Sequence, residues 1–111
     1  MKNEKIAQAF NNNEEATNSN KSFFVKRING VLIAFSYGEH FPICLKFVDG
    51  FLFNKNTYSN TTARHKNLIL YFVKHELTDS DYKTTEELKS IVDKIKYSDL
   101  KTKAEVVEMK I

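Results

Sequence analysis

The sequence predicts an α+β domain: an antiparallel sheet of four to five strands built from two hairpins, a main helix packed on one face of the sheet, and a second helix. Two turn dipeptides carry this prediction. Asn29-Gly30 and Asp49-Gly50 each lie between two short apolar runs, and both pairs tolerate the positive φ that a two-residue hairpin turn requires. The chain after the second hairpin has the apolar spacing of helices instead.

Length and composition are typical of a single globular domain. The chain has 111 residues, of which 41% are hydrophobic and 28% are charged, enough for one core. Its net charge of +3 is a small excess, whereas a nucleic-acid module usually has a sharper basic bias. Cys44 is the only cysteine, so no internal disulfide can form. We recognise no bilayer-spanning stretch and no signal peptide, and therefore expect a cytoplasmic protein without membrane contacts.

Residues 1–20 are expected to be a flexible segment outside a domain of residues 21–111. Residues 2–10 can form a short helix with Ile6 and Phe10 on one side. Residues 11–20 are polar and have almost nothing to bury, which is typical of a linker. The favoured interpretation is a disordered tail, and the alternative is an arm that docks on a partner through Ile6 and Phe10.

The first hairpin spans residues 21–37. A two-residue turn places Ile28 opposite Val31 and Phe24 opposite Phe35, and side chains alternate between the two faces of a strand. The more apolar face is the expected core side, onto which Leu68 of the main helix should pack together with Phe72. That face carries Phe24, Ile28, Val31, Ile33, Phe35 and Tyr37.

The second hairpin starts after Pro42, which cannot donate to a ladder, and runs to Lys55. Both of its faces are apolar: Ile43, Leu45, Phe47 and Leu52 share one, and Cys44, Lys46, Val48, Phe51 and Phe53 share the other. A second covering layer is the favoured explanation. The alternative is an exposed binding surface, here called the hairpin patch. It would consist of Val48, Phe51 and Phe53 flanked by Lys46 and Lys55.

Two helices follow, and the end of the chain is ambiguous. The main helix is predicted over residues 61–75, with an N-cap among residues 59–61. The second helix is predicted over residues 85–95, because Thr84 and Glu87 form a capping box before an apolar stripe. Residues 98–109 can form a third helix. Alternation of Val107, Met109 and Ile111 with charged residues indicates a strand instead, and a short terminal strand after a helical turn is favoured.

The densest polar cluster, residues 58–67, lies where the second hairpin enters the main helix. Free N–H groups at a helix N-terminus attract anions, and a candidate anion site would use Ser59, Thr61, Thr62, Arg64 and Lys66. The simpler interpretation is favoured. In it the hydroxyls cap the helix, His65 packs in the core with a hydrogen-bonded ring, and Arg64 and Lys66 are solvated.

No catalytic residue, metal ligand or cofactor is predicted. The histidines at 40, 65 and 75 lack the spacing of a metal site. An acid–base enzyme such as a nuclease, in which His65 would act with Tyr58 or His40, is the third choice of function. The second choice is a small nucleic-acid-binding module, which Lys46, Phe51, Phe53 and Lys55 fit loosely.

A resemblance adds a biological setting. The run Tyr58-Ser59-Asn60-Thr61-Thr62-Ala63-Arg64-His65 resembles a Tyr-Ser-x-Thr-Thr-x-(Lys/Arg)-His motif of a family of small uncharacterised phage and mobile-element proteins. The resemblance covers roughly residues 23–75 and implies a phage-type accessory protein in the host cytoplasm. Such a protein would bind a host protein without catalysis, for example as an anti-CRISPR-like inhibitor of a defence nuclease or another nucleic-acid-processing complex. This is the leading interpretation, and the oligomeric state stays open.

Overall fold

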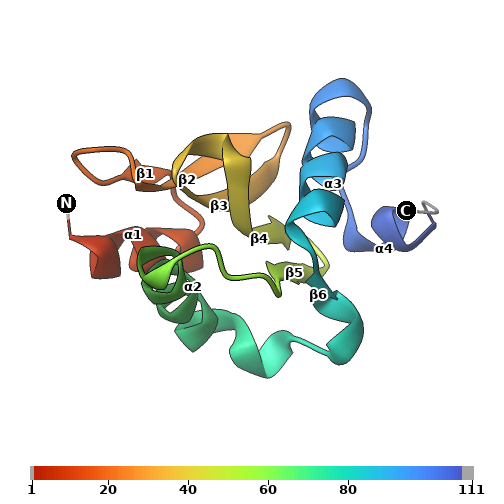
Figure 1. Cartoon of the computed structure of the whole chain (residues 1–111). Helices are drawn as coiled ribbons and strands as arrows, with labels where there is room; N and C mark the ends of the chain where they lie inside the picture. The colour runs from red at the N-terminus through yellow and green to blue at the C-terminus, as the bar shows by residue number, and fades with distance from the viewer. Residues whose placement is uncertain (1, 109–111) are drawn as a thin grey trace.

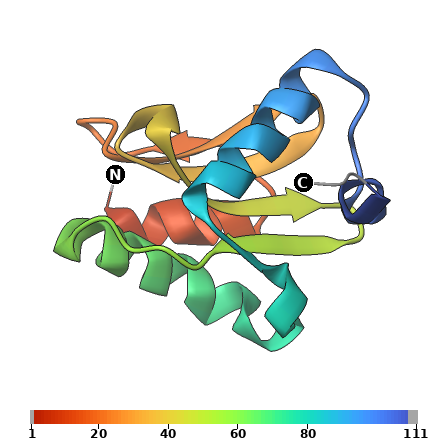
Figure 2. The same ribbon diagram turned by 45° about the vertical axis from the view of Figure 1, so that its right-hand side comes forward.

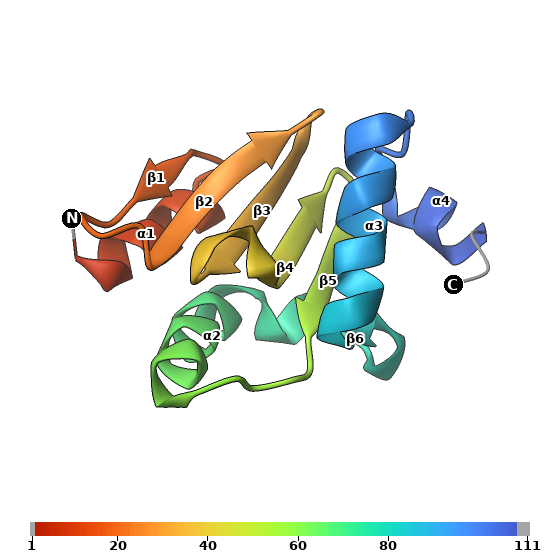
Figure 3. The same cartoon turned by 45° about the horizontal axis from the view of Figure 1, so that its top comes forward.

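The computed structural model describes residues 2–108, which form a six-stranded sheet with helices on both faces (Figure 1). The strands lie side by side in chain order (Figure 3), and every neighbouring pair is antiparallel except the parallel pair β5–β6. The predicted α+β class is confirmed. The strands are β1 Ala16–Thr17, β2 Phe23–Ile28, β3 Val31–Ser36, β4 Phe41–Phe47, β5 Gly50–Asn54 and β6 Tyr82–Lys83.

Four α-helices and three short 3₁₀ turns complete this part of the chain. Within residues 2–108 no helix combines the length and the hydropathy that crossing a bilayer requires. The α-helices are α1 Asn3–Asn11, α2 Asn60–Val73, α3 Thr85–Tyr97 and α4 Lys103–Glu108. The 3₁₀ turns are Gly38–His40, Lys74–Glu76 and Asp79–Asp81.

Both predicted hairpins are present, and the first has the predicted turn. The second turn lies one residue earlier than predicted: Gly50 already pairs with Phe47 as the first residue of β5, so the turn residues are Val48 and Asp49 instead of Asp49 and Gly50. Ile28 lies opposite Val31 and Phe24 opposite Phe35, and the first turn has positive φ at Asn29 (46°) as well as at the following glycine. The Asn29 side chain has a second task, because its amide donates to the carbonyl of Ile95 at 2.8 Å and so satisfies the C-terminal end of α3. One turn residue therefore connects a hairpin to a helix far along the sequence.

The sheet has a separate apolar core on each face, and the predicted partner of the main helix is wrong. Helices α1 and α2 cover one face and α3 covers the other (Figure 2). Helix α2 packs by Ile69 and Val73 against the face of Phe23, while Leu68 and Phe72 are only partly buried at its sides. Ile33 and Phe35 lie under α3. Strand alternation could not show which helix covers which face, because both faces are apolar.

A bulge in β4 corrects the predicted face of Ile43. The register between β3 and β4 shifts at Ala34 and Phe35, which face Cys44 and Pro42. An extra residue in one strand breaks the alternation of side chains. Ile43 consequently joins the core under α1 and α2, rather than the one that holds Leu45.

The N-terminal segment is part of the domain, so the expectation of a separate tail at residues 1–20 needs correction. Helix α1 fully buries Ile6 and Phe10 in the same core as α2, and β1 extends the sheet by pairing Ala16 with Val25. Asn18 accepts the backbone N–H of Phe23 through its side chain at 3.2 Å. The segment is polar on average, but its few apolar residues lie on one side of a helix that has a face of the sheet to cover.

The C-terminal segment is helical as far as it is described. Residues 103–108 form α4, so the strand favoured by the alternation at Val107 is wrong there. Met109 and Ile111, on which that prediction also rested, lie outside the described residues. The backbone N–H groups of Lys103 and Ala104 bond the Asp49 carboxylate at 2.7 and 3.0 Å, which supplies the N-terminal cap that a strand does not need.

Candidate binding cleft

The aromatic residues of the predicted hairpin patch do not gather on the surface. Phe53 is 2% exposed and belongs to the core under α2. Phe51 is half-buried, with its ring centroid 6.3 Å from that of Phe10. Val48 is 88% exposed but stands alone at the β4–β5 turn. The favoured alternative, a second covering layer, is therefore the arrangement found, with α1 and α2 as that layer.

The two lysines of the hairpin patch do not flank a binding surface either. The Lys46 ammonium donates to the carbonyls of Phe10 and Asn11, both at 3.2 Å, and thereby satisfies the C-terminal end of α1. Burial lowers the pKa of Lys46. Lys55 is exposed beyond the end of β5. Neither side chain frames an exposed aromatic surface.

The polar residues at the start of α2 act mainly as caps. Ser59 is the N-cap: its hydroxyl accepts the Thr62 N–H at 3.1 Å and donates to the Thr62 hydroxyl at 3.1 Å. Thr62 is fully buried, Thr61 is partly buried and Arg64 is exposed. The Ser59 and Thr62 hydroxyls therefore serve the N-cap of α2, and an anion site at Ser59, Thr61, Thr62, Arg64 and Lys66 stays a prediction.

Lys66 is not the solvated side chain that the favoured interpretation of this cluster predicted. Its ammonium donates to the Asn56 carbonyl at 2.6 Å and to the Thr57 hydroxyl at 3.2 Å, so it is bonded to the preceding loop rather than solvated. Partial burial lowers the pKa of Lys66. The lysine holds residues 56 and 57 against α2 and so fixes the position of the β5–α2 loop.

His65 is a core histidine, as the favoured interpretation predicted. It is 1% exposed, and its Nδ1 atom is hydrogen-bonded to the Ser36 hydroxyl at 2.7 Å. The imidazole stacks on the Phe23 ring with centroids 4.4 Å apart. Burial lowers the pKa of His65, and its Nε2 atom has no partner among the described residues. The neutral ring joins α2 to the end of β3.

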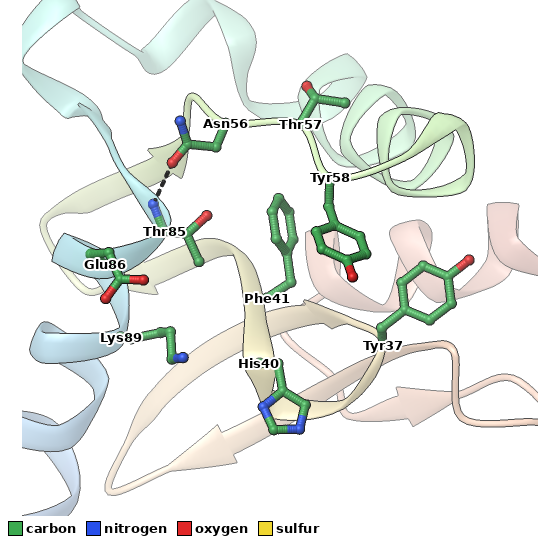
Figure 4. A pocket seen from close by; sticks show the side chains of 9 residues that line it. All are labelled: Tyr37, His40, Phe41, Asn56, Thr57, Tyr58, Thr85, Glu86 and Lys89. Carbon is green, nitrogen blue, oxygen red and sulfur yellow. Dashed lines mark hydrogen bonds between the residues drawn. The ribbon is translucent and has the colours of Figure 1, made fainter.

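The structure reveals a site that the sequence did not, a cleft of about 700 Å³ (Figure 4). Three segments far apart in the sequence form it: the β3–β4 connection, the β5–α2 loop and the first two turns of α3. The residues that line it are Tyr37, His40, Phe41, Asn56, Thr57, Tyr58, Thr85, Glu86 and Lys89.

Two exposed tyrosines border the cleft. Tyr58 is 79% exposed and Tyr37 is 43% exposed, and Figure 4 shows the Tyr58 ring between the rings of Phe41 and Tyr37. Tyr37 was expected on the core face of β3. That strand ends at Ser36 instead, and a left-handed backbone at Tyr37 (φ 56°, ψ 56°) follows. This conformation costs a non-glycine residue about 1 kcal/mol or more, and such strain clusters at functional sites.

A buried asparagine fixes the walls of the cleft. Asn54 is fully buried at the end of β5, and its side-chain amide donates to the Pro42 carbonyl at 2.8 Å and to the Thr85 hydroxyl at 3.0 Å. Its side-chain oxygen accepts the Asn56 N–H at 2.8 Å. Asn56 in turn accepts the backbone N–H of Thr85 at 2.7 Å (Figure 4). All three segments are therefore locked together, so a ligand meets a preorganised surface.

The charged side chains around the cleft differ in whether they already form ion pairs. Glu39, next to His40, already pairs with two ammonium groups, those of Lys26 at 3.2 Å and Lys96 at 2.8 Å. Lys89 has no ion-pair partner among residues 2–108 and extends toward His40 and Phe41 in Figure 4. Within the same part of the chain no three His, Cys, Asp or Glu side chains form a potential metal site.

A family assignment follows from residues 5–89, which match the model of a family of unknown function, DUF8033. The chain belongs to this family. The DUF8033 match extends from α1 into α3, so it contains every residue that lines the cleft. Comparison with curated proteins and with solved structures found no match. The description of DUF8033 names no biological origin, so the resemblance of residues 58–65 to a phage-encoded family stays a prediction.

Proposed function

We propose that this DUF8033 protein is a small, non-enzymatic binding protein that docks on a partner protein through the cleft. The observation that carries the proposal is the pair of exposed rings, Tyr37 and Tyr58, on a cleft whose walls are locked by Asn54. Exposed tyrosines anchored in a rigid frame are favoured at protein interfaces, because they contribute a large contact area for little conformational entropy.

A binding role suits the chemical groups of the cleft better than catalysis. A general acid or base needs a partner within hydrogen-bond reach. The titratable side chains on the cleft are His40, Glu86 and Lys89 with the two tyrosines, and no hydrogen bond joins any two of them. His65, a candidate base at first, is buried and bonded to Ser36.

We further propose that the partner is a host protein, as the resemblance of residues 58–65 to a phage-encoded family implies. In that setting the protein would act as an anti-CRISPR-like inhibitor of a defence nuclease. A small rigid domain can inhibit by occupying a functional surface of its target without any chemistry. Purified protein added to a reconstituted defence nuclease should then lower cleavage in proportion to complex formation, and unchanged cleavage at saturating protein would contradict this role.

The docking surface is tested by replacing one exposed tyrosine at a time. Tyr58→Ala removes a ring that borders the cleft, and Tyr97→Ala removes a ring of similar exposure, 85% against 79%, at the far end of α3. Truncation of an interface tyrosine costs about 2 kcal/mol or more, roughly thirtyfold in affinity. We expect nuclease-treated host lysate to yield a specific partner with wild type and with Tyr97→Ala, but not with Tyr58→Ala.

Two results would contradict the proposal. One is a partner retained equally by all three proteins, which would place the interface elsewhere. The other is capture that disappears when the lysate is treated with nuclease, which would favour the nucleic-acid-binding alternative. Both tyrosines are exposed, so thermal unfolding of the variants should match wild type within the few tenths of a kcal/mol expected of surface substitutions.

A further inference from the structure

We infer that the ligand of the cleft is a peptide segment that pairs one apolar anchor side chain with one neighbouring carboxylate. The inference rests on the proposed function, which it makes specific. It assigns the anchor to the rings of Tyr37, Phe41 and Tyr58, and the carboxylate to Lys89.

The apolar part of the inference comes from the three rings. They come from two different segments, the β3–β4 connection and the β5–α2 loop, and Figure 4 shows them consecutively along the cleft. Phe41 is only 5% exposed, whereas Tyr37 and Tyr58 are open to solvent. An aliphatic or aromatic side chain placed here gains apolar burial and ring contacts. A volume of about 700 Å³ accommodates such a side chain with adjoining backbone.

The cleft also offers polar groups that suit a peptide backbone. The Asn56 carbonyl and side-chain oxygen are already engaged by Lys66 and Thr85. The nitrogen of its side-chain amide forms no hydrogen bond within residues 2–108, and the same holds for the hydroxyls of Tyr37 and Tyr58. These groups can pair with peptide N–H and C=O groups, which must not be left unsatisfied in a complex.

The charge expected of the ligand follows from the number of lysine side chains near the cleft that are not already bonded within the protein. The ammonium groups of Lys26 and Lys96 are shared with Glu39, and that of Lys66 is bonded to the loop at residues 56 and 57. Lys89 is therefore the lysine on the cleft lining that is free to meet a ligand, within the part of the chain that the structure describes. One free ammonium matches one carboxylate.

The same count argues against a nucleic acid as the ligand. Tight binding to a phosphate backbone needs several lysines or arginines along a track, each releasing counterions. The cleft lining has one lysine, and the Glu86 carboxylate one turn before it would repel a chain of phosphates. A single carboxylate can approach Lys89 without a second anionic group facing Glu86.

Selection from a random peptide display library tests the inference without knowledge of the natural partner. Wild type serves as bait, and Tyr58→Ala is used for counter-selection, so the binders retained are those that need the cleft. We expect them to share a large apolar residue within one or two positions of Asp or Glu. Replacing that acid by its amide should weaken binding to wild type by about two- to fivefold, the range for an exposed ion pair.

Lys89→Ala and the neighbouring Ser90→Ala, also exposed on α3, complete the design. Lys89→Ala should weaken the acidic peptide but not its amide form, and Ser90→Ala should affect neither. The inference is overturned if the selected peptides are basic, if the amide binds as well as the acid, or if no binder depends on Tyr58. It is also overturned if a plain oligonucleotide competes at physiological salt. If Tyr58→Ala still loses the lysate partner in those cases, the proposed function stands and only the ligand assignment fails.

Discussion

The two terminal helices are attached to the same sheet by opposite means. Helix α1 places Ile6, Ala7 and Phe10 in the core beside α2, while its N-terminus has no side-chain cap. Helix α4 buries Val106 among its described residues, and polar groups hold it instead. Asp49 caps its first turn, and the Lys103 ammonium pairs with Asp81 at 2.6 Å. A segment with few apolar residues can thus attach to a domain in two ways. It can align those residues on one side of a helix and bury them, or it can form hydrogen bonds and ion pairs with the domain.

The cleft lies away from both terminal helices. Its walls come from the middle of the chain, and neither α1 nor α4 contributes a lining residue. The loop that carries Tyr58 leads into α2, which packs on one core, and Lys89 lies on α3, which packs on the other core. A destabilising substitution in either core should therefore alter the cleft only indirectly, by displacing the elements that line it.

The largest effect is expected from Phe10→Ala, which tests whether α1 is attached by burial. Phe10 is fully buried, and truncating a buried phenylalanine costs about 3–5 kcal/mol. Urea denaturation should show this loss in the free energy of unfolding, whereas Gln8→Ala on the exposed side of α1 should change it by less than about 0.5 kcal/mol. A cost below about 1 kcal/mol for Phe10→Ala would mean that α1 is not docked.

The next effect is expected from Asp81→Asn, which tests the polar attachment of α4. Burial disfavours ionisation of Asp81, but hydrogen bonds from Lys103 and Thr78, together with the Lys103 charge, hold the pKa of its carboxyl below the usual value. Substitution should lower the free energy of unfolding by roughly 1–3 kcal/mol. Asp79→Asn, in the same turn but exposed, is the matched control.

The pH dependence of Asp81 gives the same test without substitution. Because the pKa of Asp81 is depressed in the folded state, its contribution is complete above the unfolded value of 3.8 and is lost as the pH falls below it. Wild type should lose more stability than Asp81→Asn in that acid range. Equal losses would contradict a structural role for the Lys103–Asp81 pair.

Local signals in the sequence were sufficient for most elements of this fold. Asn29-Gly30 fixed the register of the first hairpin, and the capping box of Thr84 and Glu87 located the start of α3. These features depend on residues close together in the chain. The docking of α1 depends on a sheet face assembled from β2, β3 and β4, which no local pattern describes.

The site was less predictable than the fold, for the same reason. Tyr58 stands in the polar cluster singled out from the sequence, but Tyr37 was assigned to the core and Lys89 drew no attention. The cleft exists because Asn54 joins three distant segments through its side chain. An asparagine at the end of an apolar strand is a sequence signal that could have indicated a buried polar junction, but its partners cannot be read from the sequence.

A third prediction concerns His65, a buried titratable group that stacks on Phe23 in the core under α1 and α2. Burial lowers the pKa of His65 in the folded state, so the unfolded chain takes up this proton first. Proton binding then favours unfolding, and the free energy of unfolding should fall as the pH drops below about 6.5. His65→Asn retains a neutral polar group for Ser36 and should flatten this slope between pH 8 and pH 5. An unchanged slope would assign the pH dependence to other groups.

The smallest effect is expected from Glu39→Gln. Its carboxylate pairs with Lys26 and Lys96 on the surface, between the first hairpin and α3. Exposed ion pairs contribute about 0.2–1 kcal/mol, and salt screens them. The substitution should lower the melting temperature slightly at low salt and have almost no effect at high salt. A loss as large as that of Asp81→Asn would show that surface charge holds α3 as firmly as the Lys103–Asp81 pair holds α4.

Hydrogen–deuterium exchange of the protein alone and with its captured partner tests the central claim most directly. Amide protection in the complex should increase at residues 37–41, 55–60 and 84–89, the three walls of the cleft. The exposed turn at Val48 and the outer side of α2 at Tyr71 should exchange as in the free protein. Protection confined to the turn or to α2, with the three walls unchanged, would contradict the assignment of the cleft as the docking surface.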